Sequence, residues 1–218
     1  MDDLWARWRA FYEERGIRAS QICVDGIVDP TRFAAAPKRI LFVLREVNDW
    51  PGGDLRPFLA AGPRYQTWHN VARWAAGLLD GWPPYDVVDR FDRMHDALRQ
   101  IAAINLKKTT GGSVADLSVV NTFAAHDREL LVEQIERIGP QIIVACGTFD
   151  QLVWLLDLTF NPDAPWRGTA QDAARGITVV PCRHPVRCNG ARVYKELMEK
   201  FAAGRGDRGS MDEGVRGS

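Results

Sequence analysis

The chain has 218 residues and a mass of 24.5 kDa, which suits one well-buried core and leaves little room for a second full domain. It carries 28 basic and 28 acidic residues, so its formal net charge is zero and no global field would attract a polyanion. Any contact with nucleic acid must therefore come from a local basic patch.

The chain shows no sign of export or of membrane insertion. No apolar run approaches the roughly 20 residues of a membrane span. The first residues are typical of a helix that begins with acidic side chains, whereas a signal peptide would begin with a basic segment followed by an apolar one. The four cysteines form no CxxC pair. We therefore expect a cytoplasmic protein with reduced thiols and no membrane contact.

A helix is expected near the start of the chain. Trp5, Trp8 and Tyr12 belong to a set of apolar residues at one-face helical spacing, and Gly16 ends the pattern as a C-terminal cap would. This spacing predicts an amphipathic helix over 3–15, which serves either as a lid or as a packing helix. Residues 17–37 are expected to form a connector with one short extended piece at 22–28.

Four short apolar runs, typical of buried strands, alternate with segments of helical period. The strands are expected at 39–44, 101–106, 141–146 and 177–180. The helices between and after them are expected at 65–79, 87–99, 126–138, 148–156 and 191–203. This alternation predicts a single domain over 1–204 with a three-layer α/β/α sandwich and a central four-stranded parallel sheet. Residues 161–176 are expected to form a surface loop, and residues 205–218 a disordered tail.

Polar side chains follow three of these strands directly. They are Glu46, Asn48 and Asp49 after the first strand, Asn105, Lys107 and Lys108 at the end of the second, and His184 and Arg187 after the fourth. In a parallel sheet the carboxyl ends of the strands share one edge, which is where ligands bind in open α/β folds. We therefore expect an acid, an amide and an imidazole to face one cleft.

Four segments share an order and a spacing over roughly residues 38–203. They are Ile40 to Phe58 with its Pro57-Phe58 pair, Ile104-Asn105-Leu106-Lys107-Lys108, Gln134 to Gly147, and Arg183-His184-Pro185. Together they resemble the successive motifs of the uracil-DNA glycosylase superfamily, of which this chain would be a divergent member. The resemblance implies a hydrolase of DNA repair that flips an aberrant base out of DNA and cleaves its N-glycosidic bond.

The chemistry of that reaction suits the matched residues. The sugar becomes cationic and the departing base anionic, so Glu46 could place water or balance the cation, and a neutral His184 could donate to the base. Asn105 would read the Watson–Crick edge, with Phe58 stacking on the base. The residues expected to bind substrate are Asn48, Phe58, Asn105, Lys107 and Arg187. A phosphate-binding patch is expected from Lys107, Lys108, Arg183, Arg187 and Arg192. We expect a monomer that requires neither a metal nor an organic cofactor.

The residues that flank the acid on both sides depart from the family pattern. Active members usually have glycines and a proline there, where this chain has Arg45 and the run from Val47 to Asp49, and Val186 stands where a small hydroxyl residue is usual. These departures favour an alternative, a protein of the same fold that binds a base or nucleic acid without cleaving it. One branch of the family holds an iron–sulfur cluster, but Cys23 lacks the close partner found there, so we expect no cluster.

Each feature also has an ordinary interpretation. Glu46 with its neighbours could form a solvated turn, Asn105 could cap the next loop, and Phe58 could belong to the core. The lysine pair could be a solvated turn, and Cys182 and Cys188 have no further nearby ligand to complete a zinc site. An unrelated doubly wound enzyme acting on a small nucleotide-like substrate is the remaining possibility.

Overall fold

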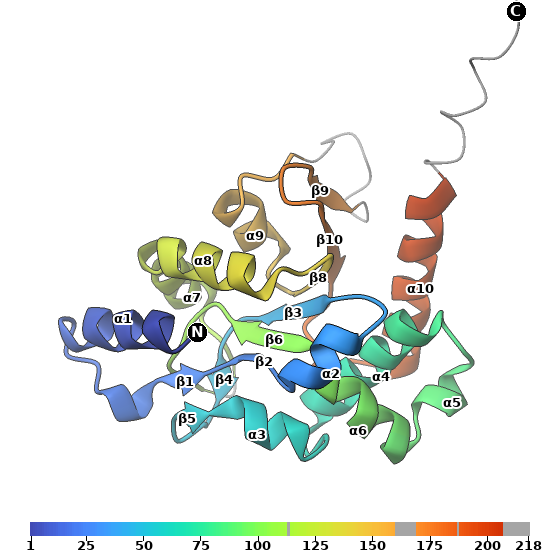
Figure 1. The fold of residues 1–218 in the computed structure, drawn as a ribbon, viewed down its shortest axis with the longest axis horizontal. Coiled ribbons are helices and arrows are strands. Elements are labelled where there is room, and N and C mark those ends of the chain that lie inside the picture. Colours follow the sequence, from blue (N-terminus) through green and yellow to red (C-terminus); the bar gives the residue numbers. More distant parts are fainter. Residues whose placement is uncertain (113, 160–168, 187, 207–218) are drawn as a thin grey trace, which may run out of the picture.

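A central sheet lies between two layers of helices (Figure 1). The computed structural model describes residues 1–112, 114–159, 169–186 and 188–206. The strands are β1 (Cys23–Val24), β2 (Gly26–Ile27), β3 (Ile40–Leu44), β4 (Val47–Asn48), β5 (Gly53–Asp54), β6 (Ala102–Asn105), β7 (Thr110–Gly111), β8 (Ile142–Cys146), β9 (Ala170–Asp172) and β10 (Ile177–Cys182). The helices are α1 (Asp2–Glu13), α2 (Pro30–Ala35), α3 (Leu55–Ala60), α4 (Gln66–Asp80), α5 (Tyr85–Val88), α6 (Phe91–Arg99), α7 (Leu117–His126), α8 (Arg128–Ile138), α9 (Phe149–Leu155) and α10 (Gly190–Gly206), with a 3₁₀ turn, η1, at Ala19–Gln21.

The main sheet has six strands in the order β2-β6-β3-β8-β10-β9. The inner four, β6, β3, β8 and β10, are parallel, so the predicted α/β/α fold and its four parallel strands are confirmed. Two antiparallel edge strands, β2 and β9, extend the sheet beyond the four strands expected; β2 lies in the short extended piece expected at 22–28, and β9 was not predicted. β9 falls within the loop expected over 161–176, where residues 160–168 lie outside the described part of the chain.

Strand β3 shows why the fold has three layers. All five of its side chains are buried, and alternate ones enter different cores. Leu41 and Val43 face the core beneath α1, α7, α8 and α9, whereas Ile40, Phe42 and Leu44 face the core beneath α3, α4, α6 and α10. A strand covered on both faces reads as a continuous apolar run, which is why this strand was predictable.

Several helix boundaries differ from the predicted ones. The helix expected over 87–99 is divided into α5 and α6, and α7 was not predicted. α10 continues to Gly206, so the helix runs two residues into the expected tail, and residues 207–218 lie outside the described part. No helix in the described ranges combines the length and the hydropathy needed to cross a bilayer.

The N-terminal helix is a packing helix and not a lid. Leu4, Trp5, Trp8 and Tyr12 of α1 are buried in the core shared with α8, and the Trp5 and Trp8 rings stack with centroids 5.1 Å apart. No residue of α1 lines the cavity at the carboxyl edge of the sheet. The helix therefore contributes to the core that it shares with α7, α8 and α9.

Helix α4 approaches α10 closely at a glycine. A Cβ atom added to Gly77 would lie 2.5 Å from Tyr194 Cε2 and 2.7 Å from Trp82 Cε3. We expect Gly77→Val to lower the free energy of unfolding by about 1–3 kcal/mol through overpacking, measured by denaturant titration. The matched control is Gly112→Val, where nothing lies within 4 Å of the new Cβ, and a change of about 0.5 kcal/mol at most is expected there. Equal effects of the two substitutions would contradict this account.

Candidate functional site

A cavity of about 610 Å³ lies at the carboxyl edge of the parallel sheet. Its lining includes five of the seven predicted site residues, namely Glu46, Asn48, Phe58, Asn105 and His184. They come from three strand ends that are distant in sequence and from α3. Of the remaining two, Lys107 is not among the lining residues, and Arg187 lies outside the described residues.

The loop that carries Glu46 is ordered by the loop after β6. β4 pairs in parallel with β7, Val47 opposite Thr110 and Asn48 opposite Gly111. The Asp49 amide donates to the Gly111 carbonyl at 3.2 Å, with the Asp49 backbone in the left-handed region at φ 48°. This pairing places the Glu46 side chain beside the second strand end, while Asn48 stays exposed at the cavity wall.

The Glu46 carboxylate is enclosed by its neighbours. Lys107 Nζ lies 2.5 Å from Glu46 Oε2, and only 6% of the Glu46 side chain is exposed. A Cβ atom added to Gly111 would lie 2.0 Å from the carboxylate carbon, so only a glycine leaves room for the acid at that point. The acid is therefore held in one position, paired with a cation, at the cavity wall.

The predicted phosphate-binding role of the lysine pair is wrong for Lys108 and is opposed by the contacts of Lys107. Lys107 Nζ donates to Glu46 and, at 2.9 Å, to the Thr110 carbonyl. The Lys108 side chain is fully buried, and its ammonium group donates to Asp25 and lies 4.9 Å from the centroid of the Trp8 ring. Neither ammonium group is placed to meet a phosphate in solvent.

The two other described arginines of the expected patch share one acid. Arg183 Nε lies 3.7 Å from Glu196 and Arg192 Nε lies 3.2 Å from it, with both guanidinium side chains more than half exposed. Such exposed pairs are weak and exchange readily with solvent. These two arginines can still turn toward a phosphate, although Glu196 offsets part of their charge.

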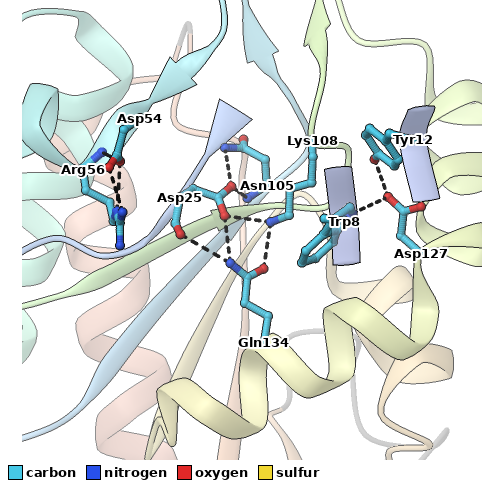
Figure 2. A network of polar contacts seen from close by, with 9 residues as sticks. All are labelled: Trp8, Tyr12, Asp25, Asp54, Arg56, Asn105, Lys108, Asp127 and Gln134. Carbon is cyan, nitrogen blue, oxygen red and sulfur yellow. Dashed lines mark hydrogen bonds and ion pairs between the residues drawn. The ribbon is translucent and has the colours of Figure 1, made fainter. Parts of the chain in front are cut away.

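Asn105 is held from behind the cavity. Its backbone N–H donates to Asp25 Oδ2 at 2.8 Å, and its side-chain Nδ2 donates to the same oxygen at 3.3 Å (Figure 2). The residue is 2% exposed, so its amide meets only the cavity and this carboxylate. Asp25 was not singled out in the sequence, because a single aspartate in a connector carries no recognisable pattern.

His184 faces the cavity as a neutral imidazole. Burial, with the Arg45 guanidinium nearby, lowers the pKa of His184 to about 4. The Val186 backbone N–H donates to Nδ1 at 3.3 Å, so the proton of the neutral ring belongs on Nε2. The ring therefore offers one N–H donor at neutral pH.

This shifted pKa predicts a pH dependence of stability. An unfolded His184 titrates near its ordinary value of 6.5, so between that value and about 4 the unfolded chain binds a proton that the folded chain does not. The free energy of unfolding is therefore unaffected by this residue above pH 6.5 and decreases as the pH falls from 6.5 to about 4. We expect wild type to lose more unfolding free energy than His184→Gln between those two pH values. Parallel curves for the two proteins in denaturant titrations would contradict the assignment.

Arg45, which lines the cavity, is held at the end of β8. Its Nε donates to the Gly147 carbonyl at 3.0 Å, and a Cβ atom added to Gly147 would lie 2.9 Å from Arg45 Nη2. Gly147 also has a φ of +68°, a conformation that favours glycine. Arg45 thus lines the wall beside His184, where its charge adds to the larger effect of burial in lowering the pKa of the imidazole.

An aromatic wall completes the cavity. The Phe58 ring stacks on Tyr65 with centroids 5.8 Å apart and meets Trp50 edge to face at 5.3 Å. Tyr65 is 64% exposed and borders the opening. Only Phe58 was predicted. Trp50 and Tyr65 were missed because they flank turns and a helix start, where helical or strand periodicity gives no signal.

The described residues contain no group of three or more His, Cys, Asp or Glu side chains arranged to hold a metal ion. The four cysteines are free thiols, and Cys188 Sγ accepts from Asn70 Nδ2 at 3.3 Å. The polar groups that line the cavity are the carboxylates of Glu46 and Asp49, the amides of Asn48, Gln66 and Asn105, the Arg45 guanidinium and the His184 imidazole, and they lie beside the aromatic wall.

The chain was compared with protein-family models and with curated proteins. No family model matches the chain, and no curated protein matches its sequence. The fold and the site therefore define an α/β/α protein with a polar and aromatic cavity at the carboxyl edge of its sheet.

Proposed function

We propose that this chain is a uracil-DNA-glycosylase-like hydrolase, which cleaves the N-glycosidic bond of an aberrant base in DNA. The observation that carries the proposal is the meeting of Glu46, Asn105 and His184 in one cavity with an aromatic wall. Its volume of about 610 Å³ is in the usual range for small-molecule sites and exceeds what one flipped base needs.

His184 is suited to stabilise the leaving base. As the glycosidic bond lengthens, negative charge builds on the base oxygens, and a fixed N–H donor in a dry site lowers the energy of that state. A neutral imidazole with its proton on Nε2 is such a donor and does not require protonation of the enzyme. The low pKa of His184 supports this role throughout the neutral pH range.

Glu46 is suited to the sugar side of the bond. The sugar becomes oxocarbenium-like, and a nearby carboxylate can balance this charge and orient the attacking water. The Lys107 contact keeps the Glu46 side chain in one place but also offsets its charge. Water would enter from the open side of the cavity, where Asn48 and Asp49 lie.

Asn105 and the aromatic wall are suited to read and hold the base. Enzymes that act on a base extrude it from the helix, then recognise its edge by hydrogen bonds and its faces by stacking. In this proposal Asn105 meets the edge, and Phe58, Tyr65 and Trp50 form the apolar side of the pocket. The protein would act as a monomer in the cytoplasm, with its DNA contacts supplied locally at the cavity rim.

The test is a glycosylase assay with purified protein on fluorescent oligonucleotides that contain uracil, hypoxanthine or xanthine. Alkaline cleavage reports abasic sites, and fluorescence anisotropy on the same oligonucleotides reports binding. We expect strand breaks on at least one substrate and their loss in Glu46→Gln. An oligonucleotide without a modified base is the substrate control. Absence of strand breaks on every substrate would refute the proposed hydrolysis, whether or not the oligonucleotides bind.

The second candidate is a protein that binds a base or a nucleic-acid end without cleaving it. The specific observation in its favour is the ion pair of Lys107 with Glu46 at 2.5 Å. The lysine offsets the negative charge that a hydrolase would use to stabilise the cationic sugar. Binding without strand breaks in the same assay would support this candidate. Lys107→Met would then test the cause, because it removes the cation from Glu46. Strand breaks that appear only in this variant would show that the ion pair suppresses cleavage.

A further inference from the structure

A buried polar network lies directly behind Asn105. Asp25, between β1 and β2, has a fully buried side chain, and each of its carboxylate oxygens accepts two hydrogen bonds. Oδ2 accepts from the backbone and side-chain nitrogens of Asn105. Oδ1 accepts from Lys108 Nζ at 2.7 Å and from Gln134 Nε2 at 3.0 Å. Figure 2 shows these groups converging on the carboxylate from β6, the following loop and α8.

The network leaves Asp25 no freedom to turn. Lys108 Nζ also donates to Gln134 Oε1 at 2.8 Å, which closes a ring of three side chains. Lys108, Gln134 and Asp25 are each at most 1% exposed, so water cannot substitute for any of these bonds. A carboxylate held in this way is a fixed acceptor for whatever lies on its Oδ2 side.

A fixed acceptor decides the orientation of the Asn105 amide. An amide side chain has two orientations that exchange its oxygen and nitrogen, and only hydrogen bonds distinguish them. In the alternative orientation Asn105 Oδ1 would face Asp25 Oδ2, which brings two acceptors together in a buried site. The observed orientation keeps Oδ1 and the second N–H of Nδ2 for the cavity.

We propose that Asp25 is a positioning residue that fixes the order of acceptor and donor with which Asn105 reads a base. This inference rests on the proposed function. The fixed order complements a lactam edge, which carries an N–H beside a C=O, as in uracil, hypoxanthine and xanthine. Cytosine and adenine carry an amino donor beside a ring nitrogen that accepts. Placed in the same position, they would set an acceptor against Asn105 Oδ1 and a donor against Nδ2, so neither amide atom would find a partner.

The test removes the preference for one orientation without leaving a buried charge. In the double variant Asp25→Leu/Lys108→Met, residue 25 offers no acceptor to the Asn105 side chain, so neither orientation of the amide is preferred. Single-turnover excision of uracil and of cytosine is measured on otherwise identical single-stranded oligonucleotides. We expect the uracil-to-cytosine rate ratio to fall by about 10- to 100-fold, with a rise in the cytosine rate. Mere loss of folded protein lowers both rates and leaves their ratio unchanged.

The control is Gln134→Leu, which disturbs the network on the Oδ1 side without touching Asn105 and should keep the ratio. If the double variant does not fold, Asp25→Leu alone carries the same expectation. If the wild type binds without cleaving, the ratio of dissociation constants replaces the ratio of rates. An unchanged ratio in a variant that still acts on or binds uracil would overturn this inference alone. A wild type that neither cleaves nor binds any of these bases would overturn the proposed function and this inference with it.

Discussion

His184→Ala is expected to slow base excision by about 100- to 1,000-fold, the usual effect of removing one donor to a developing anion. The ring is buried enough that its pKa falls to about 4, so at neutral pH it acts as an N–H donor and not as a cation. Its Nδ1 accepts a hydrogen bond from the Val186 backbone N–H, so the proton is on Nε2 and this nitrogen is the one that can donate to the base. The loss should appear in the single-turnover rate, because the substituted group meets the base as charge develops.

The matched control for this experiment is His126→Ala. His126 is exposed at the end of α7 and does not line the cavity, so its replacement should leave the rate within about threefold of wild type. Binding of the uracil oligonucleotide, measured by anisotropy, should persist in both variants. A rate for His184→Ala close to that of His126→Ala would remove His184 from the mechanism.

Lys108→Met is expected to lower the free energy of unfolding by about 3–5 kcal/mol, the usual result of removing one partner of a buried ion pair. Methionine keeps an unbranched apolar side chain at this position, so the loss reports the ammonium group and its contacts with Asp25 and the Trp8 ring rather than the packing of the stem. The Asp25 carboxylate would remain fully buried without its cation. Chemical denaturation at neutral pH measures the change.

Two comparisons isolate the cause of this loss. In Asp25→Asn/Lys108→Met both charges are removed, so most of the lost stability should return. Lys195→Met makes the same replacement in an exposed pair, where Lys195 is 72% exposed and lies 4.0 Å from Glu199, and should change stability by about 1 kcal/mol at most. A double variant less stable than Lys108→Met would show that the ion pair is not the source.

The parallel core of the fold was predictable because burial on both faces leaves a clear pattern. β3 and β8 read as unbroken apolar runs, and the polar residues that follow β3 mark its end. The extended backbone of β2 was expected within 22–28, but its place at the edge of the sheet was not, and β9 was not predicted at all. These strands contain two and three residues, too few for any periodicity, and only pairing with β6 and β10 makes them part of the sheet.

The candidate site was predictable in part for the same reason. Glu46, Asn105 and His184 stand at the ends of parallel strands, and parallel topology alone brings such residues to one edge. The pairing of Glu46 with Lys107 depends on β4 and β7, a contact between loops more than sixty residues apart. Sequence spacing does not report such contacts.

The sequence by itself determined the four parallel strands, the layers that cover them and the edge where polar residues meet, since these follow from local apolar patterns and from the handedness of crossovers. Only the tertiary structure decided what each polar group does there. Two adjacent lysines resemble a solvated turn, yet Lys107 meets Glu46 and Lys108 enters the interior to meet Asp25, which lies 83 residues earlier. The physical reason is that a buried charge is stable only beside its partner, and that partner comes from a distant part of the chain.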